Sequence, residues 1–202
     1  EFRRVLFRSA QARQRGYFDA KFSERKVEIF PEPYAAKITL KADTGERYRL
    51  GEVTFLREEG AILRESLLRR FITFKPGEEY DAARLIDLQT GLASSEYYDV
   101  VDVLPKPEAA DGQRHVPIEV QLRPNERHRI RTGPGYGTDT GPRAKLEWTL
   151  RRLNPRGHRL RTQLDVSQIE QSISTRYEIP ARQPATDHYY LKPRATRTVT
   201  DT

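Results

Sequence analysis

The stretch RAKLEWTLRRLNPRGHRLRTQLDV, residues 143–166, alternates apolar and polar side chains on both sides of a central turn. A period of two is typical of a β-strand, in which successive side chains point to opposite faces of the sheet. NPRG, residues 154–157, combines Asn, Pro and Gly as tight turns do. The stretch therefore predicts two antiparallel strands that share one apolar face. The residues expected on that face are Ala144, Leu146, Trp148, Leu150, Leu160, Thr162, Leu164 and Val166.

The same alternation continues through the C-terminal part of the chain. Helical periodicity ends at Pro124, and five strand-like segments of ~9 residues follow with short connections. Their second face is rich in Arg, Glu and Asp, which suits a water-filled lumen, whereas an Arg or Lys facing lipid costs ~2–4 kcal/mol at the bilayer midplane. Residues 125–202 are therefore predicted to form the first five antiparallel strands of a transmembrane β-barrel. A soluble sheet with one solvated face remains the alternative, although no helix is predicted here to cover its apolar side.

A mixed unit of strands and helices is predicted upstream, over residues 46–124. Apolar residues alternate in three of its segments and recur with helical spacing in two. The segments are RYRLGEVTF (47–55), AILRESLLRRFI (61–72), DAARLIDLQTGLASS (81–95), EYYDVVDV (96–103) and VPIEVQLR (116–123). Asp81 is a good N-cap for the second helix. The order predicts an α+β unit of the type β-α-α-β-β.

A partial copy of this unit precedes it. GYFDAKF, residues 16–22, is similar to EYYDVVDV, and each is followed by a turn with proline and a second strand. Residues 10–45 are therefore predicted to be the C-terminal part of an earlier copy. The first nine residues, EFRRVLFRS, resemble a translated sequencing adapter, and we expect them to be an adapter-derived artefact outside the fold.

Composition narrows the class of protein. The chain has 202 residues, a formal net charge of +7 and no cysteine. It lacks the run of ~18 apolar residues that a transmembrane helix needs, and without cysteine it has no disulfide framework or thiolate metal site. The arginines are scattered through strand-like segments and do not gather on a helix, so we expect no nucleic-acid partner. A basic soluble binding module remains the alternative from another class.

No catalytic, cofactor-binding or metal site is predicted. GPGYGTDTGPR, residues 133–143, is rich in glycine, but no helix follows it to receive a phosphate. The four histidines have no partner at metal-ligand spacing, and no Ser-His-Asp or paired-carboxylate arrangement is recognisable. We therefore expect that the protein is not an enzyme.

The order of these motifs resembles a known superfamily. RYRLGEVTF, FKPGEEYD, YYDVVDV and VPIEVQLRP resemble a polypeptide-transport-associated (POTRA) domain. GYGTDTGPR, LNPRGH and RYEIP are similar to the opening barrel strands of the BamA/TamA superfamily. TDTGPR, followed by a tryptophan and NPRGH, favours the TamA branch. The resemblance implies an α+β POTRA domain at 46–124, the end of another at 10–45, and barrel strands from 125 onward.

Location and partners are implied by the same resemblance. The barrel would lie in the outer membrane of a Gram-negative bacterium, in contact with its lipid, and the POTRA domains would lie in the periplasm. The expected partners are unfolded outer-membrane protein clients, including autotransporters, and a TamB-like inner-membrane-anchored protein. A BamA-like assembly subunit or a two-partner secretion pore remains the alternative within the superfamily.

The first barrel strand is a candidate site of client pairing. It is expected from about Arg127 to Thr138 and would pair with the last strand at a seam. Its glycines share one face, and each costs roughly 0.5–1 kcal/mol relative to alanine, so the seam is hypothesised to open and accept a client strand. Glycines that only allow curvature or close packing by Tyr136 remain the alternative. The seam candidates are Ile130, Gly133, Gly135, Tyr136 and Gly137.

Two further expectations concern strand edges. Pro134 has no N–H to donate, which suggests that it faces away from its paired neighbour. Val100, Val101 and Val103 belong to a POTRA strand that is hypothesised to dock an extended client or partner segment. An ordinary sheet edge, blunted by Asp102 and Pro105, is the alternative for that strand.

Overall fold

The computed structural model describes residues 11–31, 34–57, 63–138 and 141–198, so the adapter-like residues 1–9 lie outside it. The chain divides into two compact units. The first contains Glu1–Phe55, Phe74–Asp87 and Val103–Val120. The second contains Leu56–Thr73, Leu88–Asp102 and Gln121–Thr202.

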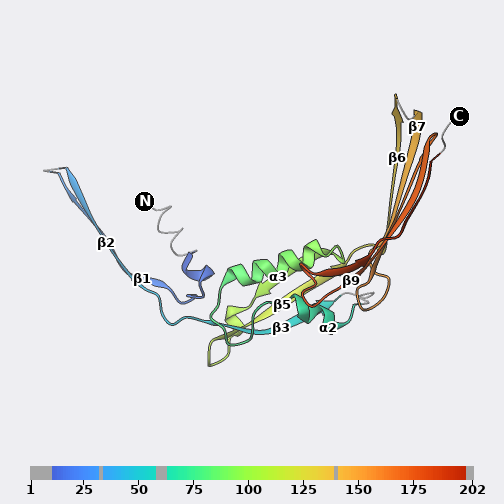
Figure 1. Ribbon diagram of the computed structural model, residues 1–202. Helices are drawn as coiled ribbons and strands as arrows, with labels where there is room; N and C mark the ends of the chain where they lie inside the picture. Colours follow the sequence, from blue (N-terminus) through green and yellow to red (C-terminus); the bar gives the residue numbers. More distant parts are fainter. Residues whose placement is uncertain (1–10, 32–33, 58–62, 139–140, 199–202) are drawn as a thin grey trace. The chain divides into compact units, whose positions relative to one another are not determined.

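The chain contains a three-stranded sheet in the order β3-β5-β4. Its strands are β3 (Arg49–Arg57), β4 (Tyr98–Pro105) and β5 (His115–Pro124). The helix α3 (Ala82–Ser94) runs along this sheet (Figure 1). Alternate side chains of β5, those of Val116, Ile118 and Val120, are completely buried, because one face of the strand belongs to the core.

The second helix predicted from the sequence is α3. The backbone N–H of Ala83 donates to Oδ1 of Asp81 at 2.9 Å, so the expected N-cap is confirmed. Leu85, Leu88 and Leu92 recur with helical spacing and are at most 5% exposed. The apolar stripe of α3 is therefore buried, as its period predicts.

The first predicted helix, at 61–72, is much shorter than expected. Residues 61 and 62 lie outside the described ranges, and the helical part is α2 (Glu65–Leu68), continued by the 3-10 turn η1 (Arg69–Phe71). Arg64 is extended, with ψ of 142°, and its N–H donates to the carbonyl oxygen of Pro155 at 2.9 Å. A tertiary hydrogen bond therefore holds this backbone outside the helix. A second 3-10 turn, η2 (Pro107–Ala109), follows β4.

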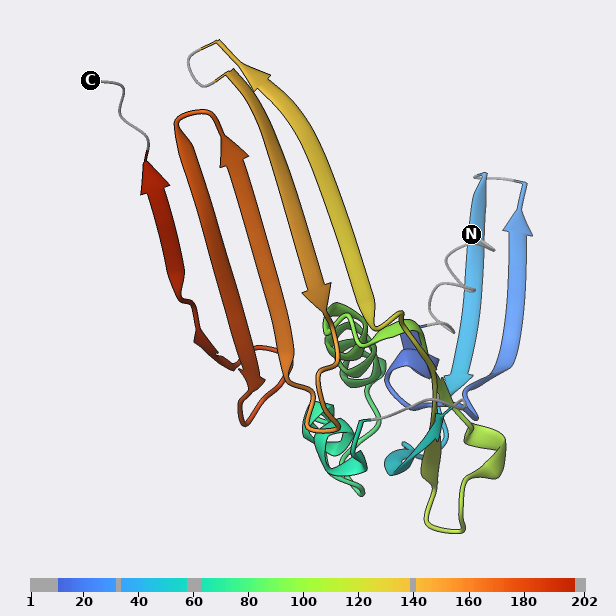
Figure 2. The same ribbon diagram turned by 90° about the vertical axis from the view of Figure 1, so that its right-hand side faces the viewer.

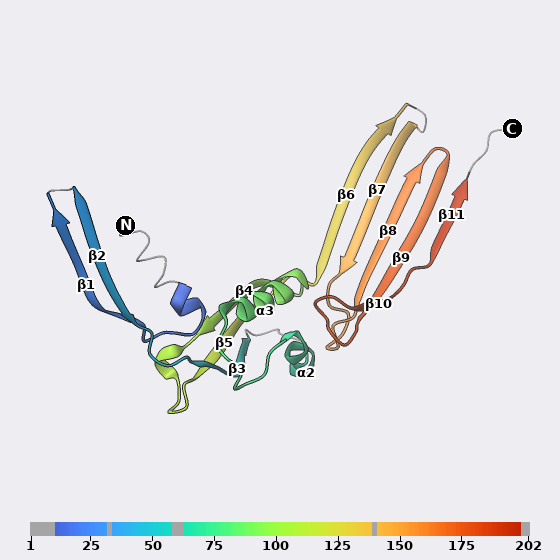
Figure 3. The same cartoon turned by 60° about the vertical axis from the view of Figure 1, so that its left-hand side comes forward.

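The first unit also holds the hairpin of β1 (Lys21–Phe30) and β2 (Ala35–Asp43), which pair antiparallel with an irregularity between Phe22 and Glu24 (Figure 3). Ahead of this hairpin, the ring of Phe18 packs edge-on against Tyr48 and Tyr80, with centroid distances of 5.2 and 4.9 Å. The segment ahead of β1 thus contacts two separate parts of the chain, at Tyr48 and Tyr80, through aromatic rings.

The C-terminal part forms a six-stranded sheet whose described strands pair antiparallel (Figure 2). The strand order in the sheet is β10-β9-β8-β7-β6, and β11 also pairs with β9. The strands are β6 (His128–Gly137), β7 (Gly141–Leu150), β8 (Arg159–Ser167), β9 (Glu170–Pro180), β10 (His188–Leu191) and β11 (Arg194–Thr198). Sequential neighbours pair from β6 to β9, so this part is a meander, as the alternation predicts.

The last predicted strand is interrupted. β10 pairs with the end of β9 at Tyr177 to Pro180, and β11 pairs with its start at Glu170 to Ser174. Pro193 lies between the two and has no N–H for the ladder, although its carbonyl oxygen accepts from Thr175 N–H at 3.0 Å. The fifth strand position is therefore filled by two short strands where a single one was expected.

The register confirms the predicted apolar face. Leu146 pairs with Leu164, and Leu164 pairs with Ile173, so the three side chains form one row across β7, β8 and β9. Leu146 and Leu164 are 40% and 37% exposed, and Ile173 is 47% exposed. An exposed apolar row across three strands is what a membrane-facing sheet requires. None of the helices in the described residues is long and apolar enough to span a membrane.

Candidate functional site: the edge strand β6 and the junction at its base

β6 forms one edge of the six-stranded sheet and, among the described strands, pairs only with β7. The register sets Gly133, Gly135 and Gly137 opposite Lys145, Arg143 and Gly141, on the charged face. Ile130 and Tyr136 belong to the apolar face, where they are 65% and 75% exposed. The seam candidates therefore lie on one edge strand but divide between its two faces.

Hydrogen-bonding parity decides which backbone groups of β6 point away from β7. Arg127 and Arg151 continue the register, and the Arg151 N–H donates to the Arg127 carbonyl oxygen at 2.9 Å. Bonded and non-bonded pairs alternate along an antiparallel ladder, so odd-numbered residues of β6 bond to β7 and even-numbered residues point their N–H and C=O outward. The outward set contains Ile130, Thr132 and Pro134. Pro134 thus faces away from β7, as the sequence suggests.

Close packing does not impose glycine at position 133, and at position 135 it involves only the Arg143 side chain. A Cβ at Gly133 would meet nothing within 4 Å, and one at Gly135 would lie 2.8 Å from Nε of the flexible Arg143 side chain. The ring of Tyr136 is too exposed to pack on them. Packing by that ring therefore does not explain these glycines, whereas backbone freedom remains available as an explanation.

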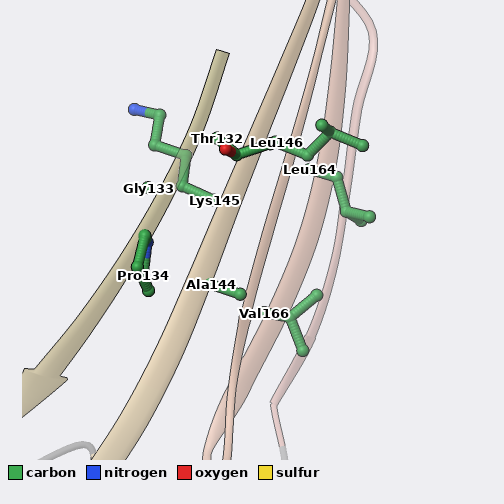
Figure 4. Close-up of a pocket in the computed structure, with 8 residues that line it drawn as sticks. All are labelled: Thr132, Gly133, Pro134, Ala144, Lys145, Leu146, Leu164 and Val166. Carbon is green, nitrogen blue, oxygen red and sulfur yellow. The ribbon is translucent and has the colours of Figure 1, made fainter. Parts of the chain in front are cut away.

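A shallow hollow of about 270 Å³ lies on the sheet beside Pro134 (Figure 4). The small residues Gly133 and Ala144 leave space for the hollow, and Leu164 and Val166 line it on the side away from β6. Its lining is mainly apolar, and the charged side chain of Lys145 extends away from Leu164 and Val166. The hollow adjoins the free edge of the sheet, where an additional strand would place its side chains.

The junction below β7 and β8 is built on Tyr97. Its hydroxyl donates to the carbonyl oxygen of Gly157, in the NPRG turn. The guanidinium of Arg159 lies 5.5 Å from the Tyr97 ring centroid and donates to the Ser95 carbonyl oxygen at 3.0 Å. Tyr97 is 1% exposed, and burial raises its pKa to about 12. This turn is therefore fixed to the segment before β4.

Arginines crowd the same junction. Arg151 donates to Asn125 Oδ1 at 3.1 Å and to the Glu126 carbonyl oxygen at 2.9 Å, and its Nε lies 4.0 Å from a carboxylate oxygen of Glu96. Arg152 is 7% exposed, donates to the Asn125 carbonyl oxygen, and buries Nε and one terminal nitrogen without a protein partner. Burial lowers the pKa of Arg152. The junction thus carries more positive than negative charge.

β4 occupies an edge of the three-stranded sheet, where the second candidate lies. Val101 is 7% exposed and its carbonyl oxygen accepts from Nε2 of Gln89 at 2.9 Å, while Val100 and Val103 are half-buried. A hollow of about 380 Å³ is lined in part by Val100 and Asp102. Val101 is thus a core residue, while the side chains of Val100 and Val103 are partly exposed.

From the sequence, NPRG is recognisable only as a turn, and the roles of Tyr97, Asn125 and Arg152 are not predicted. The motif LNPRGH identifies the region in the sequence, but nothing in it predicts that Tyr97 and Arg152 are buried there. Among the described residues, no group of three or more His, Cys, Asp or Glu side chains could hold a metal ion.

Comparison with solved structures defines the class of fold. No protein-family model matches the chain. BamA from Haemophilus ducreyi lacking POTRA domains 1–3 superposes with a TM-score of 0.72 at 18% identity, over 96% of this chain and 36% of that one. CdiB from Acinetobacter baumannii gives 0.54 at 15% identity, over 88% and 33%. The chain therefore shares the fold of these BamA and CdiB structures.

The similarity to these two proteins covers only about a third of each of them. Identities of 18% and 15% establish the fold alone. The TamA branch favoured by TDTGPR and NPRGH thus remains a prediction, as do the partners that the resemblance implies.

Proposed function

We propose that the chain is part of an outer-membrane factor that assembles or translocates β-barrel proteins, with its POTRA domains in the periplasm. The observation that carries the proposal is the sheet from β6 to β11, which has an exposed apolar face and a free edge and directly follows a POTRA-like unit. An apolar surface of this extent marks an interaction or membrane site on a soluble protein, and a bilayer accepts it without a helix layer.

Clients would dock by strand addition. The outward N–H and C=O groups of β6 can pair with an extended segment of an unfolded outer-membrane protein, since an open sheet edge binds a peptide through main-chain hydrogen bonds. The edge strand β4, at Val100 and Val103, offers a second place of contact for clients on the periplasmic side. No catalytic step is required by this mechanism.

Within the superfamily, we place the chain in the TamA branch on the basis of TDTGPR, Trp148 and NPRGH. Its clients would then include autotransporters, and its partner would be a TamB-like inner-membrane-anchored protein. Co-purification of the complete membrane protein with that partner supports this assignment, whereas stable association with a different set of assembly proteins would favour a BamA-like subunit or a secretion pore.

Site-specific labelling tests the membrane face. The chain has no cysteine, so single cysteines can be introduced without background. A dye on Leu146→Cys or Leu164→Cys should be quenched by a lipid-borne quencher in phospholipid vesicles. The matched positions Lys145→Cys and Gln163→Cys, on the charged face, should be quenched from the aqueous phase. Equal aqueous quenching at all four positions would favour the basic soluble module and end the proposal.

A further inference from the structure

The free edge of β6 is not a continuous hydrogen-bonding ladder. Its outward residues His128, Ile130, Thr132 and Tyr136 each present one N–H and one C=O, by the parity that the Arg151–Arg127 bond sets. Pro134 lies between Thr132 and Tyr136 and presents only its carbonyl oxygen. The missing N–H donor therefore lies inside β6, before the last β6–β7 pair at Gly137–Gly141.

A strand docked along the whole edge would lose a hydrogen bond at that position. Its carbonyl group opposite Pro134 finds no donor, and in a bilayer no water replaces the missing partner. Proline is tolerated on an edge strand because the outward position needs no N–H for the sheet's own ladder. The same missing N–H limits what the edge can bind. Pairing from His128 to Thr132 avoids the gap.

We infer that Pro134 divides the free edge of β6 into two segments and that a docked strand is held by the lower segment, His128–Thr132. This inference rests on the proposed function, because it specifies how the strand addition at β6 ends. The occupant is an extended polypeptide strand with an apolar side chain opposite Ile130. Next to it, a polar or acidic side chain suits Arg131, whose side chain is 57% exposed and has a terminal nitrogen 3.7 Å from a carboxylate oxygen of Glu147.

The missing donor and the glycines are separable causes of weak pairing. The N–H groups of Gly133 and Gly135 point toward β7, so these residues remove no hydrogen bond from the outer edge. A methyl group at Gly133 would have open space, so Gly133→Ala changes backbone freedom with little other effect. Pro134→Val instead restores a donor on the edge.

Residue-level hydrogen exchange on the 202-residue chain in detergent micelles tests the inference. The probe is a synthetic peptide with the sequence of β8, RLRTQLDVS, which alternates apolar and polar residues. In the unaltered chain the peptide should protect the amides of Ile130 and Thr132 and leave that of Tyr136 exchanging. In Pro134→Val, protection should extend to residue 134 and Tyr136, and the peptide should bind ~5–10-fold more tightly for the restored hydrogen bond.

Two control variants accompany this experiment. Pro142→Val removes a proline from β7, opposite Tyr136, without changing the free edge of β6, and should leave peptide binding unaltered. Gly133→Ala should leave the protected set unaltered. Pro134→Thr serves as a second donor-restoring variant, and protection of the Arg129 and Gly133 amides by β7 verifies the fold in each case.

The outcomes separate this inference from the proposed function. Two results would overturn the role of Pro134 while strand addition stands. The first is protection of the Tyr136 amide by the peptide in the unaltered chain. The second is equal amide protection and peptide affinity in the unaltered chain and both donor-restoring variants. Absence of any peptide protection along β6 would overturn strand addition itself, and the inference with it.

Discussion

The Tyr97 hydroxyl donates a hydrogen bond to the Gly157 carbonyl oxygen, across 60 residues of sequence. The same segment is held a second time, because the Asn125 N–H donates to the Tyr97 carbonyl oxygen at 3.0 Å. Tyr97 lies between α3 and β4, and it joins this segment both to Asn125, which precedes β6, and to the turn between β7 and β8. Changes at these residues should act on the junction while leaving the strand ladders in place.

Gly157→Ala should destabilise the junction by about 2–4 kcal/mol, since it combines backbone strain with overpacking. Gly157 has φ of +76°, and a Cβ there would lie 2.5 Å from Leu67 Cδ2. The matched control is Gly77→Ala, where φ is +91° but nothing lies within 4 Å, so only the backbone cost of ~1–2 kcal/mol applies. Hydrogen exchange of the amides around each glycine measures both effects. Equal losses at the two positions would contradict the packing of Gly157 on Leu67.

Tyr97→Phe should cost about 1–3 kcal/mol at neutral pH, because the buried Gly157 carbonyl oxygen loses its donor. Urea titrations followed through Trp148, the single tryptophan of the chain, measure this loss. A variant as stable as the unaltered chain would show that the hydrogen bond makes no net contribution. Tyr80→Phe, at another buried tyrosine, controls for the loss of any phenolic hydroxyl.

Stability should fall as the pH rises from 10 to about 12. Burial raises the pKa of Tyr97 from 10.0 to about 12, so in this window the folded chain keeps a proton that the unfolded chain has lost. Below pH 10 this contribution is fully present. The same unfolding experiment at stepped pH should show a shallower decline in Tyr97→Phe. A decline equal to that of the unaltered chain would assign the effect to other tyrosines.

Arg152→Met should leave stability unchanged within about 1 kcal/mol or raise it, because it removes a buried charge that has few acceptors. Arg151→Met is the matched variant and should cost about 2–4 kcal/mol, since it removes two charge-assisted hydrogen bonds, to Asn125 Oδ1 and to the Glu126 carbonyl oxygen. Thermal unfolding of both variants in the same detergent provides the comparison. A larger loss of stability in Arg152→Met than in Arg151→Met would show that Arg152 stabilises the junction more than Arg151 does.

Leu146→Lys should weaken insertion into phospholipid vesicles by about 2–4 kcal/mol, the cost of a cation on a lipid-facing strand. Gln163→Lys, on the charged face of the neighbouring strand β8, should change insertion by much less. Flotation of the two variants with vesicles measures the inserted fraction. Identical flotation would show that the apolar row does not face lipid.

Much of the fold could be predicted because local pattern and tertiary structure agree. Alternation along β7 and β8 placed Leu146 and Leu164 on one face, and the register pairs these two residues directly. The N-cap at Asp81 follows from a local side-chain preference in the same way. The first helix was overestimated because its apolar spacing is helical, while the contact between Arg64 and Pro155 holds its start extended.

The candidate site was predicted only in part, because the sequence placed Pro134 on an edge but could not show which residues lie beside it or what its neighbours contact. Alternation assigned Arg151 to a solvated face, yet the structure buries it to 8% exposure against Asn125 and Glu126. The sequence by itself determined the strands, their two faces and the turn at NPRG, since these depend on neighbours two to four residues apart. Only the tertiary structure decided the link from Tyr97 to Gly157, the buried arginines and the break before β11, because these depend on contacts between residues far apart in the chain.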